Sequence, residues 1–207
     1  RPNSGKSTLI NRFLGEERML VSEESGTTRD SIEVDLNKIG KEITIIDTAG
    51  VRKKRSITDK LEKLSVSKSL ESIRSSHVVV LLIDSRETMV DQDMHLLGLS
   101  LALGRPVIIG MNKVDLLKDR DHASYLCDDI ASKIRFAKYI KIHQLSAKDG
   151  SGIDSLIRLA EKAYSISIKD LETPILNKIL QKAAKMQPPP YNKKFRPKLR
   201  YAHAGGK

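Results

Sequence analysis

Short apolar runs alternate with longer amphipathic stretches along most of the chain. The runs at residues 78–83, 106–111 and 140–145 have the length of strands, and the first is apolar throughout, as expected for a strand buried on both faces. Apolar residues recur at helical spacing elsewhere, which predicts helices over residues 5–14, 60–73, 91–103, 121–133 and 153–164. This alternation predicts an α/β fold with a doubly wound, mostly parallel sheet covered by helices on both faces.

Two further strands are predicted near the start of the chain. Residues 31–39 and 42–48 flank a Gly40-Lys41 turn. We expect them to form an antiparallel hairpin at the edge of the sheet.

The pattern changes after residue 164. Residues 165–173 lack a clear period, and Pro174 then begins a helix that extends to about residue 185 with an apolar face. The run Pro188-Pro189-Pro190 predicts an extended segment, and residues 198–204 alternate as a strand does. We therefore assign residues 1–168 to one domain and residues 169–207 to part of a small α+β domain.

The first residues of the chain match a phosphate-binding loop. They fit the P-loop pattern G-x-x-x-x-G-K-[ST] without its first glycine. In such a loop, backbone N–H groups at the start of a helix bind phosphate oxygens. Lys6 would reach the β- and γ-phosphates, and the Ser7 hydroxyl would ligate Mg²⁺. The nucleotide-binding residues predicted here are Arg1, Pro2, Asn3, Ser4, Gly5, Lys6, Ser7 and Thr8.

A P-loop normally follows a strand, and none precedes it in this sequence. In a doubly wound sheet that strand is central, between the strands at residues 42–47 and 78–83. Its loss would leave two unpaired edges inside the core. We therefore expect the sheet to lack its first strand and the sequence to be a fragment of a longer chain.

A second motif ends the strand predicted at residues 42–48. An aspartate at this place can hold Mg²⁺ through water, and the Gly50 N–H can contact the γ-phosphate. The predicted nucleotide-binding residues of this motif are Asp47, Thr48, Ala49, Gly50 and the following Val51.

The run Asn112-Lys113-Val114-Asp115 follows the strand at residues 106–111 and indicates the base. An aspartate carboxylate accepts hydrogen bonds from the ring N–H and the exocyclic amine of guanine, whereas adenine offers no matching pair of donors. The run Ser146-Ala147-Lys148, after the strand at residues 140–145, resembles the base-backing loop of small GTPases. Each motif taken singly could be an ordinary turn or cap. Four of them in this order, each beside a predicted strand or helix end, favour GTP.

Charge is distributed unevenly along the chain. The formal net charge is +11, and residues 173–207 hold nine Lys and Arg with no Asp or Glu, so the remainder is close to neutral. Tyr191, Phe195 and Tyr201 lie among these cations, a mixture typical of RNA-binding surfaces, although any single cation could equally be a solvated side chain. The predicted RNA-binding residues are Lys193, Lys194, Arg196, Lys198 and Arg200.

Composition also bears on the compartment. The one cysteine, Cys127, cannot form an internal disulfide, which favours the reducing cytoplasm. No apolar stretch reaches membrane-spanning length and no signal peptide is visible, so we expect no membrane partner.

Together these motifs resemble the Der (EngA) family of bacterial GTPases, which have two tandem G domains and a C-terminal KH-like domain. The resemblance covers the second G domain and the start of the KH-like domain. It is most specific at residues 26–30, 47–54, 188–190 and 198–206. It implies a role in large ribosomal subunit assembly, with ribosomal RNA or the large subunit as partner. It also implies a first G domain of the same chain that is missing here.

The resemblance assigns a catalytic role to one further residue. Thr28 would contact Mg²⁺ and the γ-phosphate, with Thr27 the less favoured candidate. The predicted catalytic residues are Lys6, Thr28 and Gly50, and the predicted Mg²⁺ ligands are Ser7, Thr28 and Asp47.

Val51 raises a mechanistic question. Many GTPases place Gln at this position to orient the attacking water, and valine has no polar atom to do so. In the potassium-activated GTPases that the chain resembles, the P-loop asparagine, here Asn3, helps to bind K⁺. Asn3 could instead only cap its loop. Arg29 and Arg52 are possible charge donors, although a solvated arginine is the simpler interpretation of each.

Several functions stay open at this point. The first is a slow GTPase switch that controls docking to ribosomal RNA. The second is an RNA-binding module that senses nucleotide with negligible turnover. A related potassium-activated GTPase of tRNA modification is another alternative to the first. The third is an ATP-using P-loop enzyme, which the run at residues 112–115 disfavours.

Overall fold

The computed structural model of the chain describes residues 3–16, 32–38, 40–47, 69–117, 119–191 and 195–204. The chain divides into two compact units, Arg1–Ser167 and Ile168–Lys207.

A three-stranded parallel sheet forms the centre of the first unit. Its strands β3 (Val79–Asp84), β4 (Val107–Asn112) and β5 (Lys141–Gln144) pair in that order. Every residue of β4 is buried, as expected for the middle strand of a sheet covered on both faces. The predicted α/β fold with a parallel sheet is confirmed.

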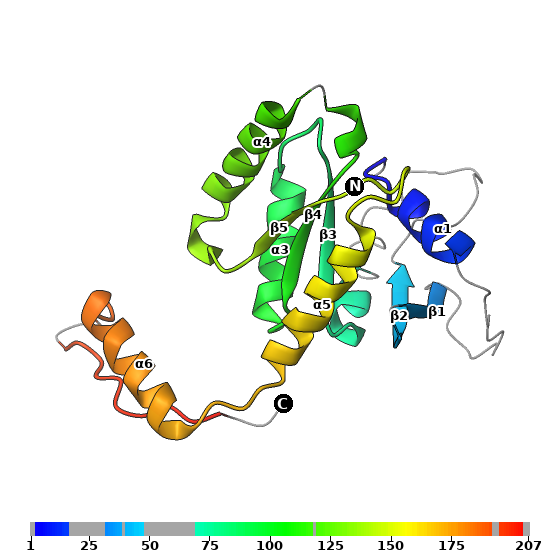
Figure 1. The fold of residues 1–207 in the computed structure, drawn as a ribbon. Coiled ribbons are helices and arrows are strands. Elements are labelled where there is room, and N and C mark those ends of the chain that lie inside the picture. Colours follow the sequence, from blue (N-terminus) through cyan, green and yellow to red (C-terminus); the bar gives the residue numbers. More distant parts are fainter. Residues whose placement is uncertain are drawn as a thin grey trace, which may run out of the picture. The chain divides into compact units, whose positions relative to one another are not determined.

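Helices cover the two faces of this sheet (Figure 1). They include α1 (Lys6–Glu16), α3 (Asp91–Ala102), α4 (Arg120–Lys133) and α5 (Ile153–Ser167). Because side chains alternate along a strand, Ile109 packs into the layer formed with α3 and α4, whereas Ile108 packs into the layer formed with α1 and α5. Both side chains are almost fully buried, at 0% and 2% exposed. The carboxyl ends of the strands are therefore held at one rigid edge.

The predicted hairpin is present as β1 (Ile32–Lys38) and β2 (Lys41–Asp47), which pair antiparallel. Gly40 lies in the turn with φ 71°, a conformation that glycine adopts without strain. The hairpin forms a sheet of its own, and no described strand joins it to β3. Among the described strands, the hairpin is therefore an edge without the central strand expected between it and β3. It packs instead through Ile43 and Ile45 onto the α1 and α5 layer.

Shorter segments complete the first unit. Residues 69–75 are helical, and the predicted start of that helix lies outside the described residues. Two single turns of 3-10 helix, η1 (Val114–Leu116) and η2 (Arg135–Ala137), follow β4 and α4. In the part of the chain that the structure describes, no helix has both the length and the apolar character needed to span a membrane.

The second unit contains α6 (Thr173–Met186), with a proline in its first turn as predicted. The strand expected at residues 198–204 is absent from the structure, so that prediction was wrong. A strand needs a hydrogen-bonded neighbour, and no described residue supplies one to this segment. The Ala202 N–H instead donates to Asn177 Oδ1 on α6 at 2.7 Å.

Candidate functional site

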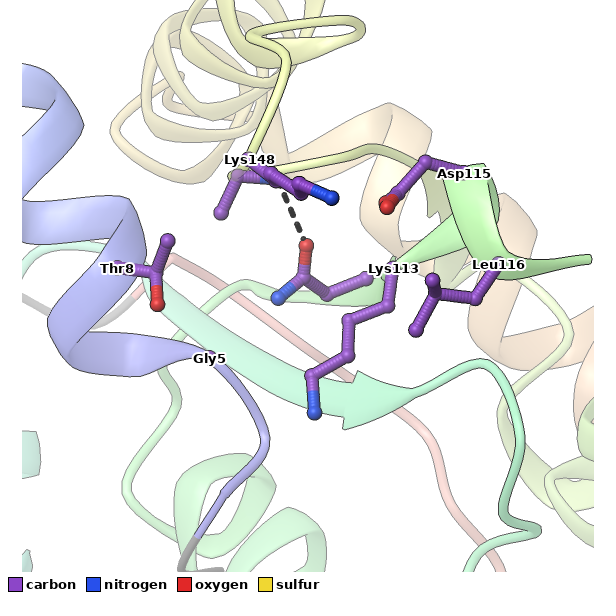
Figure 2. Close-up of a pocket in the computed structure, with 8 residues that line it drawn as sticks. Gly5, Thr8, Lys113, Asp115, Leu116 and Lys148 are labelled. Atoms are coloured by element: carbon purple, nitrogen blue, oxygen red, sulfur yellow. Dashed lines mark hydrogen bonds between the residues drawn. The ribbon is translucent and has the colours of Figure 1, made fainter.

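The predicted motifs meet where β3, β4 and β5 end. This edge of a parallel α/β sheet is where such folds bind their ligands. A pocket of about 300 Å³ opens there, and Figure 2 shows its lining side chains converging from α1, the end of β4 and the loop after β5. The lining residues are Gly5, Thr8, Asn112, Lys113, Asp115, Leu116, Ala147 and Lys148.

Asn112 joins the phosphate loop to the loop after β5. Its Nδ2 donates to the Ser4 carbonyl at 2.9 Å, and its Oδ1 accepts from the Ala147 N–H at 2.9 Å, the bond dashed in Figure 2. The side chain is 1% exposed. The side-chain amide therefore sets the spacing between two loops whose contacted residues, Ser4 and Ala147, are more than 100 positions apart in the sequence.

Gly5 is required by the same contact. Its φ is 92°, and a Cβ at this position would lie 2.1 Å from Asn112 Nδ2. That distance is far below van der Waals contact, so the phosphate loop can approach Asn112 only because residue 5 has no side chain.

Lys113 ties the end of β4 to two other segments. Its backbone is left-handed, with φ 68°, and its Nζ donates to the Asn3 carbonyl at 2.6 Å and to Asp84 Oδ2 at 2.7 Å. Asn3 is also left-handed, with φ 63°. The lysine thus holds the phosphate loop from a second point.

Asp84 is a site residue that the sequence reasoning missed. It ends β3, is 4% exposed, and receives the Arg86 guanidinium through Nε at 3.0 Å and Nη2 at 2.8 Å. These hydrogen bonds from Arg86, with the contact from Lys113, hold the pKa of Asp84 well below the ordinary aspartate value against the opposing effect of burial. The sequence did contain a signal for Asp84, because this aspartate directly follows a fully apolar predicted strand, as the other motifs follow theirs.

Asp115, the predicted base reader, is exposed and borders the pocket. Ser146, which is 0% exposed, donates through Oγ to Asp115 Oδ1 at 2.6 Å. In Figure 2 the Asp115 carboxylate points toward the middle of the lining residues. The buried serine therefore fixes the orientation of the carboxylate. Val114 contributes through its backbone, since its N–H donates to the Leu145 carbonyl at 3.4 Å.

The loop that carries Ser146, Ala147 and Lys148 is held from several directions. Arg12 on α1 donates through Nη2 to the Asp149 carbonyl at 2.5 Å. His143 Nε2 lies 2.7 Å from the Gly152 carbonyl, which fastens the far end of the loop to β5. Arg12 and His143 were not predicted, because nothing local marks a residue that supports a distant loop.

The phosphate loop leads directly into α1. Ser4 is 3% exposed, and Lys6 Nζ lies 3.4 Å from Ser4 Oγ. The first N–H groups of a helix have no acceptor within the helix, and this is the usual basis of phosphate binding at such a position. Ser7 and Thr8 follow in the first turn of α1, and Thr8 borders the pocket.

The donors fit Mg²⁺ as far as they are described. The ion prefers oxygen ligands, keeps several waters and needs few protein side chains. Ser7 supplies a hydroxyl in the first turn of α1, and Asp47 ends β2, although its side chain is not described. Among the described residues, no cluster of three or more His, Cys, Asp and Glu forms a self-contained metal site.

Part of the predicted site lies outside the described residues. This holds for Arg1, Pro2, Thr28, Thr48, Ala49, Gly50, Val51, Lys193 and Lys194. In the second unit, Arg196, Lys198 and Arg200 are described and exposed. The Arg196 guanidinium lies 4.5 Å from the centre of the Tyr191 ring.

Comparison with known proteins agrees with this geometry. GTPase Der of Teredinibacter turnerae is 45% identical over 206 residues, which is 100% of this chain and 44% of that protein. GTPase Der of Bordetella pertussis is 44% identical over 206 residues, again 100% of this chain and 46% of that protein. The chain thus spans less than half the length of these curated relatives.

Solved structures show the same fold. Era of Aquifex aeolicus, a variant bound to GDP and AlF₄⁻, is 28% identical with a TM-score of 0.61, and the match covers 79% of this chain and 54% of that one. Era in complex with MgGDPNP and nucleotides 1506–1542 of 16S ribosomal RNA is 28% identical with a TM-score of 0.62, over the same shares.

A family model agrees with these likenesses. The model described as 50S ribosome-binding GTPase matches residues 1–113. The resemblance to Der found in the motifs is confirmed by the identities above. The chain belongs to the 50S ribosome-binding GTPase family.

Proposed function

We propose that the protein binds GTP, hydrolyses it slowly, and uses its nucleotide state to control association with the large ribosomal subunit during assembly. The observation that carries the proposal is the Asn112 bridge between the phosphate loop and the loop after β5. Gly5 and Thr8 line the pocket on the side of the phosphate loop, and Asp115, Ala147 and Lys148 line it on the side of the loops after β4 and β5.

Base selection is assigned to Asp115. Because Ser146 holds one carboxylate oxygen, the group is oriented without being neutralised. It would accept from the two donors of guanine, while adenine would leave the carboxylate unpaired. Lys113 would lie along the base, and Ala147 and Lys148 would back it.

Phosphate binding is assigned to residues 1–8. Lys6 would neutralise the β- and γ-phosphates, and the backbone at the start of α1 would donate to their oxygens. Ser7, Asp47 and Thr28 would hold Mg²⁺, which offsets the charge of the phosphates when it is bound. The Gly50 N–H would donate to the γ-phosphate. The conformation of the neighbouring Thr48, Ala49 and Val51 would then depend on whether the γ-phosphate is present.

Val51 has no polar atom, so it can neither orient the attacking water nor offset charge on the phosphates. We assign the neutralisation of that charge to a monovalent cation, K⁺, held with help from Asn3. The backbone of Asn3 is left-handed, and Lys113 Nζ donates to its carbonyl. These two features support the proposal because they fix the backbone conformation of Asn3. Lys6, Thr28 and Gly50 remain the proposed catalytic residues.

The domain assignment is also part of the proposal. Residues 1–168 would form the G domain, and residues 169–207 the start of a KH-like RNA-binding domain. The exposed Arg196, Lys198 and Arg200, with Lys193 and Lys194, would contact ribosomal RNA. The Era structure solved with ribosomal RNA supports an RNA partner for this class of GTPase. A further G domain of the same protein and a cytoplasmic location complete the proposal.

An Asp115→Asn variant tests the base assignment. The amide keeps an oxygen for Ser146 and places a donor toward the base, so preference should move from guanosine to xanthosine nucleotides by at least tenfold. Asp121→Asn, an exposed aspartate on α4, is the matched control and should leave both affinities unchanged. Unchanged preference in the Asp115 variant would refute the base assignment.

Turnover separates the switch from a nucleotide-sensing RNA module. Hydrolysis should be faster in K⁺ than in Na⁺, and Asn3→Ala should remove that difference. Equal rates in the two salts would rule out the cation, and no measurable turnover in either would favour the sensing module.

A further inference from the structure

The turn between α4 and β5 exposes two aromatic rings. In this segment, residues 135–141, Phe136 is 64% exposed and Tyr139 is 71% exposed. By contrast, Phe13 on α1 is 5% exposed and lies in the core. Two aromatic rings left mostly in water within four residues make this segment, here called the basic-aromatic turn, a candidate contact surface.

The backbone holds the two rings outward. Ala137 and Ile140 are 1% and 6% exposed and pack in the core beneath the sheet. The Ala137 N–H donates to the Ile134 carbonyl at 2.8 Å, and the Ile140 N–H donates to the Ala137 carbonyl at 3.0 Å. Because buried residues alternate with Phe136 and Tyr139, the turn presents both rings on an anchored scaffold.

The charged residues close to these rings in the sequence are of one sign. Residues 130–148 contain no Asp or Glu. Arg135, Lys138 and Lys141 lie within the turn and are exposed. Asp129, the acid that precedes this stretch, already pairs with Lys133 at 3.3 Å.

We propose that the basic-aromatic turn is a binding surface for single-stranded or looped RNA. Three cations within one turn suit a phosphate backbone, and two exposed rings suit stacking of unpaired bases. An apolar partner would not need the cations, and a duplex would not use the rings. The inference rests on the proposed association with the ribosome, and it adds a contact in the first unit that is separate from the cations of residues 193–200.

The test uses a short fluorescent RNA oligonucleotide without secondary structure, titrated with the protein over a series of salt concentrations. The double variant Phe136→Ala and Tyr139→Ala should lose about tenfold or more in affinity, since truncation of a stacking ring has effects of this order. Its dependence on salt should not change. The double variant Lys138→Gln and Lys141→Gln should instead make the negative slope of log affinity against log salt shallower by about 1.4, or about 0.7 for each cation.

The chain offers matched controls. Tyr125 on α4 is 68% exposed, nearly as much as Tyr139, but lies between the acidic Asp121 and Asp128. Tyr125→Ala should leave RNA affinity unchanged. Lys162→Gln on α5, also exposed, is the control for loss of one cation and should leave the salt slope unchanged. GTP affinity of every variant should equal that of the wild type, which shows that the fold is intact.

A second arm measures cosedimentation with large ribosomal subunits. If the Phe136→Ala and Tyr139→Ala variant loses both cosedimentation with the subunits and oligonucleotide binding, the proposal is supported. If that variant loses cosedimentation but binds the oligonucleotide as the wild type does, the turn contacts a ribosomal protein and the proposal is overturned. Oligonucleotide binding by the aromatic variant within twofold of wild type would also overturn it. If the wild type binds GTP but does not sediment with the subunits, the ribosomal part of the proposed function fails, and the oligonucleotide titration still decides this inference.

Discussion

The buried amide of Asn112 allows a prediction worked directly from the structure. Asn112→Ala removes both hydrogen bonds of the bridge, leaving the Ser4 carbonyl and the Ala147 N–H without this partner. Ser4 and Ala147 are each 3% exposed, so water cannot readily replace the amide. A buried polar group that loses its partner costs roughly 1–3 kcal/mol. Two such groups lower the free energy of unfolding by roughly 2–6 kcal/mol by the same principle.

Asn112→Asp separates the two halves of the bridge. One carboxylate oxygen can still accept from Ala147, but the other replaces the donor that now lies 2.9 Å from the Ser4 carbonyl. Two acceptors then face each other, and a charge is buried. Both effects raise the folded-state pKa of the new carboxyl above its unfolded value. The protonated form can donate to Ser4, so its stabilisation is present at low pH and lost as pH rises through the raised pKa.

Urea unfolding of the wild type, Asn112→Ala and Asn112→Asp between pH 4 and pH 8 measures the loss of stability and its dependence on pH. GDP affinity is measured alongside. Near neutral pH we expect both variants to be destabilised and to bind GDP at least tenfold more weakly. At low pH Asn112→Asp should recover relative to Asn112→Ala. Gln144→Ala, an exposed amide on β5, is the control and should change stability by about 0.5 kcal/mol or less. A loss below about 1 kcal/mol for Asn112→Ala would refute the reasoning.

Two further changes probe the neighbouring contacts. Gly5→Ala would place a Cβ 2.1 Å from Asn112 Nδ2 at a φ of 92°, so we expect the free energy of unfolding to fall by about 1–3 kcal/mol and GDP to bind more weakly. Gly15→Ala in α1 is the control, because its Cβ would meet nothing within 4 Å and the change should be neutral or stabilising. Equal effects of the two substitutions would contradict the close approach of Gly5 to Asn112. Asp84→Asn should lower the free energy of unfolding by about 1–3 kcal/mol near neutral pH, less than for a fully buried pair because the Arg86 side chain is 55% exposed. Because the folded-state pKa of Asp84 is lowered, this difference from wild type should be full above the ordinary aspartate pKa and should shrink as pH falls below about 4; a difference independent of pH would show that the charge is not responsible.

The motifs could be found in the sequence because each is local. A phosphate loop needs Gly5 beside Lys6, and the base reader needs Asn112 and Asp115 at fixed spacing after a strand. The alternation of apolar runs and amphipathic stretches was likewise enough to predict the parallel sheet and its helical layers. The prediction of a strand at residues 198–204 failed because alternation reports only which side chains could share a face. Whether a strand forms depends on a hydrogen-bonded partner elsewhere in the chain.

By itself, the sequence determined the fold class, the order of the motifs and the uneven distribution of charge, since all of these depend on residues close together in the chain. Only the tertiary structure decided how the motifs meet. It placed Asn112 between Ser4 and Ala147, paired Lys113 with Asp84, and brought Arg12 to the loop after β5. These contacts join residues 29 to 137 positions apart, and no short pattern encodes them. The physical reason is that a buried polar group must find a partner in space, and packing of the sheet and its helices determines which residue that is.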